Sequence, residues 1–384
     1  MAKVITTELQ HSGASAANIT LDSSKNVTCE NNLQVDGNVS VTGTLPANKL
    51  TGALPAISGA SLTGIASPLS FRNYIINGQF QVWQRATTSG STTSDGYLAA
   101  DRWRTSASGA TYTFSRQEFT LGQTDVPSHP TYFGRFAVTT GDDHVNIHTR
   151  IEDVKRIQGQ VTLSFWAKGS NPAGGNIQIN RTQQFGSGGS ADVQAEIDTF
   201  TVDGTWTKKT FTFTLPSISG KTIGGGSYLG IDFRQPAGDD GSAAWTLDIT
   251  NVQLELGATA TDFEMRSYGD ELARCQRYFC KSWNSDVAVG TDSGVGVRGY
   301  RNNGTARSDM PCDVWFPVEM RTTPTMTCYN SSSPVAGKVQ NGGGTSNFTY
   351  WMGLSAKGTY GIGSADNLAD GAWYAFHFTS DAEL

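Results

Sequence analysis

The first 68 residues contain no large aromatic side chain, and their aliphatic residues stand in short pairs separated by turns, such as Ile19 with Leu21 and Val39 with Val41. Each pair places two small apolar groups on one face of a very short strand. Such a thin stripe cannot close a core around itself, because an isolated two-stranded ribbon is only marginally stable in water. The segment therefore predicts that something outside the single chain covers the stripe.

The most economical cover is the same stripe on identical neighbours, with three chains wound around one axis. This arrangement predicts a fibrous trimeric shaft over residues 1–68 that is stable only in the oligomer. A disordered tail rich in Ser and Gly is the alternative, but the regular spacing of the aliphatic residues counts against it. The predicted shaft core consists of Ile19, Leu21, Val27, Leu33, Val35, Val39, Val41, Leu45, Leu50, Leu54 and Leu62.

The whole chain has the composition of a folded and mostly β protein. Its 384 residues allow two or three domains, at about 100 to 200 residues for each domain. Charged residues make up only 16% of the chain, 44 residues are Gly, and aromatic residues reach 10% with nine Trp. Low charge combined with this aromatic content favours a β-forming surface over helix or disorder.

Residues 69–266 predict a globular β domain. In QVTLSFWAK, Leu163 and Phe165 share one face of a strand while Trp166 points to the other face, as in a half-buried antiparallel strand. In AWTLDITNVQLELG the buried parity shifts near Thr250 and Asn251, which predicts a β-bulge. Further strands are expected at 112–119, 133–139, 144–151, 175–182 and 228–235. The strands and their turns favour a two-sheet sandwich of jelly-roll type.

One helix is predicted over residues 267–283, where it links the sandwich to a smaller distal β domain at 284–384. Ser267 is placed to cap the start of this helix. Beyond the helix, segments such as DVWFPVEM and AWYAFHF return to short strands separated by Gly and Asn turns. The apolar residues at helical spacing are Tyr268, Leu272, Cys275 and Phe279.

The charge pattern argues against several classes of partner. The formal net charge is -6, and no basic cluster is longer than Lys208-Lys209, so the chain has little with which to neutralise a phosphate backbone. No window approaches the roughly 20 apolar residues needed to span a bilayer, and the N-terminus lacks the pattern of a signal peptide. We therefore expect neither nucleic-acid binding nor membrane insertion.

The residues that most often hold metals are not arranged for it in this sequence. The five cysteines are odd in number and lack CxxC spacing, which argues against a zinc site or a disulfide framework and fits a reducing cytosol. His144 and His148 alternate with apolar residues on a predicted strand, which separates the two rings by roughly 13 Å, too far for one ion. We expect no metal and no cofactor.

Catalysis is not expected either, although the sequence has adjacent carboxylates. A glycosidase needs an acid and a base about 5 to 9 Å apart across a sugar. Neighbouring residues on a strand point to opposite faces, and neighbours in a turn usually face solvent. The pairs in question are Asp142/Asp143, Glu152/Asp153 and Asp239/Asp240.

Binding of a sugar requires flat aromatic faces flanked by Asn, Asp or Arg, which can bond its hydroxyl groups. The last domain has such residues in turn-rich settings, and Trp166 faces outward by its strand parity. The alternative is that these rings fill small cores or the trimer interface. The candidate glycan-binding residues are Trp166, Trp283, Asn284, Tyr300, Arg301, Asn302, Tyr350, Trp351 and Tyr360.

Several segments of the chain resemble structural fibre proteins of tailed bacteriophages, particularly marine and cyanobacterial phages. The N-terminal MAKVITTELQHSG and the LPANKLTGALP repeat are similar to their shafts. The segments FRNYIINGQFQVWQR, YLAADRW, RIEDVKRIQGQVTLSFWAKG and ITNVQLELGATATDFEMRSYGDELARCQRYF are similar to a sandwich module that these fibres share with carbohydrate-binding modules. FPVEMRTTPTMT and HFTSDAEL resemble the small β domain at their end.

The resemblance implies a homotrimeric virion component that is assembled in the host cytoplasm. Its N-terminal part would attach to tail or baseplate proteins, and its distal domains would bind host surface glycan by multivalent contact. Related modules often hold calcium near the first strand, but Gln81 stands where an acid is expected and Asp248 is the one acidic candidate. A head fibre or capsid decoration protein with a structural role, and an envelope polysaccharide depolymerase, are the alternatives.

Overall fold

The computed structural model describes residues 8–9, 19–21, 27–29, 71–140, 144–173, 175–236, 244–342 and 344–384. The chain divides into two compact units, Met1–Ile65 and Ala66–Leu384.

In the first unit, β1 (Glu8–Leu9), β2 (Ile19–Leu21) and β3 (Val27–Cys29) form a three-stranded antiparallel sheet. Leu21 lies opposite Val27 in its register. The short strands predicted at Ile19/Leu21 and Val27/Cys29 are therefore confirmed. The other predicted shaft positions, from Leu33 to Leu62, lie outside the described residues, and the trimeric shaft stays a prediction.

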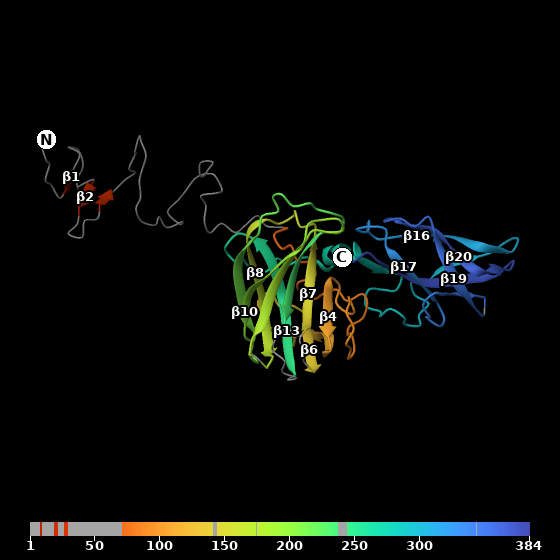
Figure 1. Ribbon diagram of the computed structural model, residues 1–384, viewed down its shortest axis with the longest axis horizontal. Coiled ribbons are helices and arrows are strands. Elements are labelled where there is room, and N and C mark those ends of the chain that lie inside the picture. The colour runs from red at the N-terminus through yellow and green to blue at the C-terminus, as the bar shows by residue number, and fades with distance from the viewer. Residues whose placement is uncertain are drawn as a thin grey trace. The chain divides into compact units, whose positions relative to one another are not determined.

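The second unit begins with a β-sandwich of two five-stranded antiparallel sheets, in accordance with the predicted architecture (Figure 1). We call the first sheet the open sheet; in order it contains β10 (Val193–Phe200), β9 (Ile177–Gln184), β12 (Tyr228–Arg234), β7 (His144–Glu152) and β4 (Trp103–Ser108). The second, the covered sheet, contains β11 (Thr207–Leu215), β8 (Gly159–Ser170), β13 (Trp245–Leu256), β6 (Tyr132–Thr140) and β5 (Thr111–Glu118).

The core of the sandwich lies between these two sheets, because alternate residues of each strand point inward. Leu163 and Phe165 on β8 are fully buried, as their parity predicts. Phe165 packs edge-on against Phe233 of the opposite sheet, with ring centroids 4.9 Å apart. Each large apolar side chain buried in this way contributes about 1.5–3 kcal/mol, so the two sheets hold each other through this core.

The predicted β-bulge is present on β13, where the register with β8 shifts between Thr250 and Gln253. Asn251 adopts the left-handed region there, with φ of 52°, a conformation that Asn tolerates better than most residues. Its side-chain amide donates to the Pro127 carbonyl at 3.2 Å and to Ser128 Oγ at 3.0 Å. The bulge therefore holds a loop over the outer face of the covered sheet.

A small second core lies on that outer face and gives the covered sheet its name. Val126, Phe133 and Trp206 are buried together there, and Phe119 and Trp166 pack against them. No corresponding apolar cluster covers the outer face of the open sheet in the described part of the chain. The two faces of the sandwich are therefore different surfaces.

Helix α1 spans Tyr268–Gln276, and Ser267 caps it by accepting a hydrogen bond from the Asp270 N–H, as predicted. The expectation of a helix through residue 283 is wrong. Phe279 belongs to β14 (Phe279–Lys281), where it lies opposite Asp381. The apolar spacing continued past the helix end because all three residues of β14 are buried in a sheet.

The remaining strands form a curled sheet that is the second β region of this unit (Figure 1). Its path runs β14, β21, β18, β19, β20 and β16, while β15 and β17 also pair with β21. The core includes Met310, Ile362 and Phe376. The strand bounds are β15 (Arg298–Arg301), β16 (Arg307–Trp315), β17 (Thr325–Asn330), β18 (Lys338–Asn341), β19 (Gly344–Met352), β20 (Gly358–Leu368) and β21 (Trp373–Asp381).

Candidate functional site

The outer face of the open sheet carries rows of polar side chains that run across its strands. One row joins four strands, because Arg104 lies opposite His148, His148 opposite Asp232, and Asp232 opposite Asn180. All four residues share the outward parity of their strands, since residues such as Ile147 and Phe233 between them point into the core.

A neighbouring row has a gap at its centre. Gly230 lies between Arg150 and Thr182 in the strand register and has no side chain to fill the space. A Cβ added at Gly230 would meet nothing closer than 3.4 Å, from the Tyr228 ring. The result is a hollow of about 270 Å³, which we call the groove. Its lining comprises Arg104, Ser106, Asn146, His148, Arg150, Thr182, Asp192, Gln194, Tyr228, Gly230, Ile231, Asp232 and Arg234.

Hydrogen bonds fix the side chains of the groove in place. Arg234 donates from Nε to Asp232 Oδ1 at 2.7 Å and from its terminal nitrogen to Oδ2 at 3.0 Å. His148 Nδ1 lies 2.9 Å from Asn146 Oδ1. Held in this way, these groups are oriented before any ligand arrives, which lowers the entropy lost on binding.

Arg150 connects the groove to the end of the chain. Its guanidinium lies 4.5 Å from the centre of the Tyr228 ring, and it donates a hydrogen bond to the Leu384 carbonyl oxygen. The Tyr228 ring is half-buried and is the aromatic ring of the groove lining. Guanidinium, carboxylate, imidazole and amide groups around one ring can bond many hydroxyls of a polar, uncharged ligand.

The sequence-predicted residue Trp166 lies elsewhere, on the outer face of the covered sheet. Its outward parity is confirmed, but the ring is half-buried against the second core of that sheet. It also lines a separate hollow of about 350 Å³ with Lys208 and Asn251. Trp166 therefore does not join the groove.

Trp283 and Asn302 are buried, contrary to a role on an open binding surface. The Trp283 ring stacks on His377 with centroids 4.0 Å apart, and its N–H donates to the Thr291 carbonyl at 2.9 Å. The Asn302 amide donates to the carbonyls of Thr305 and Ala369, both at 3.1 Å. These two residues fill structural positions of the curled sheet, since both their polar and apolar atoms are already engaged.

The other predicted residues of the distal region are spread over its surface. Trp351 is half-buried, donates to the Met326 carbonyl at 3.2 Å, and packs on Phe348. Tyr300 is half-buried, and Arg301 and Asn284 are exposed. Tyr350 and Tyr360 keep 52% and 55% of their surface open.

The groove residues are not among the candidate residues that the sequence predicts, although their strands carry a signal. HVNIHTR on β7 and YLGIDFR on β12 alternate apolar residues with residues that can bond a ligand. That alternation was interpreted as an ordinary strand surface. Only the pairing of β4, β7, β12 and β9 brings the polar halves of these strands together.

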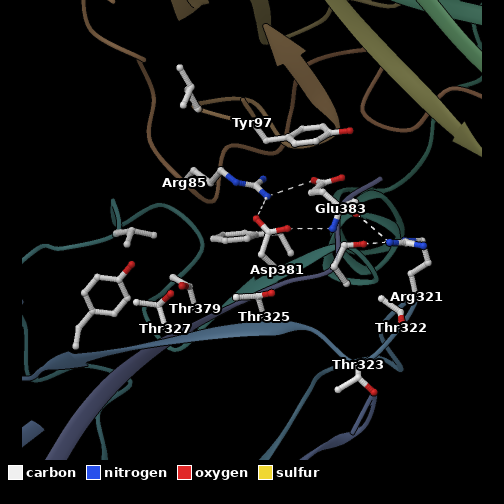
Figure 2. A pocket seen from close by; sticks show the side chains of 15 residues that line it. Arg85, Tyr97, Arg321, Thr322, Thr323, Thr325, Thr327, Thr379, Asp381 and Glu383 are labelled. Carbon is white, nitrogen blue, oxygen red and sulfur yellow. Dashed lines mark hydrogen bonds and ion pairs between the residues drawn. The ribbon is translucent and has the colours of Figure 1, made fainter. Parts of the chain in front are cut away.

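A larger pocket of about 770 Å³ lies where the curled sheet meets the sandwich, and we call it the junction pocket (Figure 2). Arg85 lies between Asp381, at 3.1 Å, and Glu383, at 3.3 Å. Arg321 donates to the carbonyls of Ala382 and Glu383 at 2.8 and 2.9 Å. The hydroxyl-bearing wall consists of Thr322, Thr323, Thr325, Thr327 and Thr379.

The charges of the junction pocket bind one another and hold the C-terminal segment. Glu383 also pairs with Arg102, whose guanidinium lies over the Tyr278 ring at 3.5 Å. Burial alone would lower the pKa of Arg85, but the carboxylates of Glu383, Asp101 and Asp381 outweigh it and raise that pKa. The arginine therefore stays charged, and the pocket is a structural joint.

The described residues offer neither a metal cluster nor a membrane-spanning helix. No group of three or more His, Cys, Asp or Glu side chains is placed there to hold a metal ion. Asp248, the one acidic calcium candidate, instead pairs with Arg135 at 2.7 Å. None of the described helices has the length and apolar character required to cross a membrane.

Comparison with known proteins finds one similarity within the sandwich. Residues 73–223, which run from the segment before β4 through β11, match the family model described as a carbohydrate binding domain. No curated protein matches the chain.

Solved structures with similarity include the enzymatically active domain of tailspike protein 4 of bacteriophage CBA120. Its identity is 16% and its TM-score 0.30, over 48% of this chain and 21% of the tailspike chain. The N-terminal cellulose-binding domain of a β-1,4-glucanase from Cellulomonas fimi has 16% identity and a TM-score of 0.27, over 44% of this chain and 96% of that domain. The similarity of the β-sandwich to carbohydrate-binding domains rests on the match of residues 73–223.

Proposed function

We propose that the groove on the open sheet binds a carbohydrate chain. The observation that carries this proposal is the cross-strand set of oriented polar groups around Gly230 and Tyr228, on the sandwich that matches a carbohydrate-binding domain. A sugar presents hydroxyls along its edges and C–H groups on its faces. The polar rows suit the hydroxyls, and the Tyr228 ring suits a C–H face.

The groove suits a chain better than a compact ligand, because it lies along an open sheet face that no second core covers. It combines the guanidiniums of Arg104, Arg150 and Arg234 with the carboxylates of Asp192 and Asp232. Since both charge signs are present and Arg234 is already paired with Asp232, the groove favours a ligand held by many hydrogen bonds over one held by its charge.

We extend the proposal to the whole protein as a phage virion fibre that attaches to the host surface. The sequence resemblance to phage fibre proteins supports this, together with the thin apolar stripe of residues 1–68. In a homotrimer, three weak glycan sites on one stalk multiply a modest affinity by avidity. Light scattering on the full chain should give the mass of a trimer, and immunogold labelling of particles should place the protein on the tail; labelling of the head would favour the structural alternative.

The protein acts by binding and not by cleavage in this proposal. Of the candidate acid pairs, Asp142/Asp143 and Asp239/Asp240 lie outside the described residues. Glu152 is held by Arg277, at 2.8 and 3.0 Å, and by the Tyr278 hydroxyl at 2.7 Å. A carboxylate that accepts three such hydrogen bonds from two residues serves as a structural anchor. Shortened glycan chains after incubation would contradict this part of the proposal.

The test of the groove is to fill it. Gly230→Leu places a side chain at its centre, while Gly204→Leu is the matched control, because a Cβ at Gly204 meets nothing within 4 Å and the residue is not part of the groove. Affinity electrophoresis in gels that contain barley β-glucan, xylan or bacterial lipopolysaccharide should retard the unmodified protein and the control. Gly230→Leu should lose at least about tenfold in affinity. Equal retardation of both variants, or none of any protein, would refute the proposal.

A further inference from the structure

We infer that the curled sheet carries a second sugar site, at the turn that joins β19 to β20, and that this site takes one uncharged pyranose ring. It goes beyond the proposed function because it shares no residue with the groove. A hollow of about 130 Å³ lies there, and we call it the hairpin pocket. Its main lining residues are Asp313, Trp315, Gly353, Ser355, Gly358 and Tyr360.

Two aromatic rings form the sides of the hairpin pocket, and both are open to solvent. Trp315 is 72% exposed and Tyr360 is 55% exposed. Among the described residues the two rings do not stack on each other, and both line the same hollow. Neither ring belongs to the buried core of the curled sheet.

Glycines explain why the rings have free faces. A Cβ at Gly353 would lie 2.2 Å from the Tyr360 ring, so that ring lies directly on the backbone of a residue without a side chain. Trp315 lies opposite Gly358 in the register of β16 and β20. A Cβ at Gly358 would come within 2.1 Å of the Val314 carbonyl oxygen. Both glycines are therefore required, and neither leaves a side chain that could cover a ring.

The polar groups of the pocket divide into engaged and open ones. Ser355 Oγ donates to the Gly358 carbonyl at 3.2 Å, and Thr359 Oγ1 donates to the Met352 carbonyl at 2.7 Å. These bonds shape the turn. The exposed Asp313 carboxylate and the Trp315 indole N–H have no hydrogen-bond partner among the described residues. An acceptor and a donor thus remain for a ligand.

The size, the aromatic sides and the charge of the hairpin pocket indicate which ligand it can bind. Ligand pockets for drug-sized molecules measure about 300 to 1,000 Å³, so a hollow of about 130 Å³ suits a single ring and not a helix or a peptide strand. The C–H face of a pyranose packs on an aromatic face, and a carboxylate can accept from two neighbouring hydroxyls. The Asp313 charge disfavours uronic or sialic acids, because like charges repel.

The experiment uses the full chain and free sugars. Saturation-transfer NMR with D-glucose, D-galactose and N-acetyl-D-glucosamine should give a signal from at least one of them, and D-glucuronate should give none. Trp315→Ala and Tyr360→Ala should each weaken that sugar by about tenfold or more. Trp373→Ala is the matched control, because Trp373 is also exposed, at 48%, but does not line the pocket; its variant should bind within about twofold of the unmodified protein.

The Gly230→Leu groove variant separates this inference from the proposed function, since it should keep the monosaccharide signal while it loses the polysaccharide. No signal from any neutral sugar, a stronger signal from D-glucuronate, or an unchanged signal in Trp315→Ala would overturn the inference. A second copy of the chain is the competing occupant. If Trp315→Ala lowers the oligomeric mass in sedimentation while the sugars bind as before, the pocket is a protein interface and the inference is wrong.

Discussion

The groove and the hairpin pocket present two different ways to build a binding surface on β-strands. The groove is polar, extends across β4, β7, β12, β9 and β10, and holds one half-buried ring. The hairpin pocket is small, lies at one turn, and is lined by two exposed rings and one open carboxylate. A flat sheet face is wide enough for a chain of sugars, whereas a turn can offer only a place for one ring. In this proposal the groove would bind several consecutive sugar units of a glycan, and the hairpin pocket would bind one sugar unit.

The largest expected effect concerns the joint that connects the two β regions. Glu383→Ala leaves Arg85 and Arg102 buried without their shared carboxylate, which should lower the free energy of unfolding by about 3–5 kcal/mol. Urea unfolding followed by intrinsic fluorescence measures this loss. Glu319→Ala is the control, because its pair with Lys357 spans 3.9 Å between exposed side chains and should contribute below about 1 kcal/mol. A loss from Glu383→Ala no larger than that of the control would show that the two regions do not depend on this joint.

The next effect concerns Gly353, because a substitution there should affect the hairpin pocket and leave the groove unchanged. Gly353 has a φ of 59°, and a methyl group there would displace the Tyr360 ring. Gly353→Ala should therefore cost about 1–3 kcal/mol of stability and remove monosaccharide binding, while polysaccharide binding in the groove persists. Gly342→Ala carries the same backbone strain, with φ of 56°, but meets nothing within 4 Å. If both variants bind the monosaccharide equally, the position of the Tyr360 ring does not matter.

A smaller effect depends on pH and concerns β7, a strand that carries part of the groove. Burial opposes the charge of Glu152, but hydrogen bonds from Arg277 and Tyr278 outweigh it, so the pKa of Glu152 is lowered. Its contribution to stability, about 1 kcal/mol for a pair partly open to water, is therefore complete above the ordinary carboxyl pKa and is lost as pH falls through the lowered value. Because Glu152 ends β7, acid should loosen the strand that carries His148 and Arg150.

The variant Glu152→Gln isolates that contribution. Its difference in unfolding free energy from the unmodified protein should be present at neutral pH and should shrink toward zero in strong acid, as measured by urea unfolding across a pH series. A difference that stays constant with pH would mean that the Glu152 charge contributes nothing. Monosaccharide binding at the hairpin pocket should be the same in both proteins.

Much of the sandwich can be predicted from the sequence, because the alternation of apolar and polar residues along a strand depends only on neighbouring residues. The parity of β8 and the bulge at Thr250 follow from residues a few positions apart. Which outer face stays open could not be predicted in the same way, because Trp206 and Phe119 come from distant loops to cover one sheet. The helix end was missed for a similar reason, since Phe279 pairs with Asp381, about a hundred residues later in the chain.

The candidate site residues also divide into features that the local sequence predicts and features that depend on distant contacts. Aromatic side chains next to Asn and Arg were a reasonable signal, but exposure depends on what lies beneath a ring. Trp283 is covered by His377, whereas Tyr360 lies on a glycine from a neighbouring strand end. Trp315 alternates with the buried Val314 and Phe316, so its outward parity is a local property. Its place next to Tyr360 depends on the pairing of β16 with β20, which the local sequence does not predict.

The smallest effect concerns Tyr228, whose contribution to polysaccharide affinity could come from the face of its ring or from its hydroxyl. The Tyr228 ring is held against the Arg150 guanidinium, and its hydroxyl makes no hydrogen bond among the described residues. Tyr228→Phe should therefore change polysaccharide affinity by less than about twofold, and Tyr228→Ala should weaken it about two- to tenfold through loss of the stacking face. Affinity electrophoresis of the two variants side by side measures the difference. A large loss in Tyr228→Phe would mean that the hydroxyl bonds the sugar directly. The groove would then depend on polar contacts more than the hairpin pocket does, and the contrast between the two sites would be sharper.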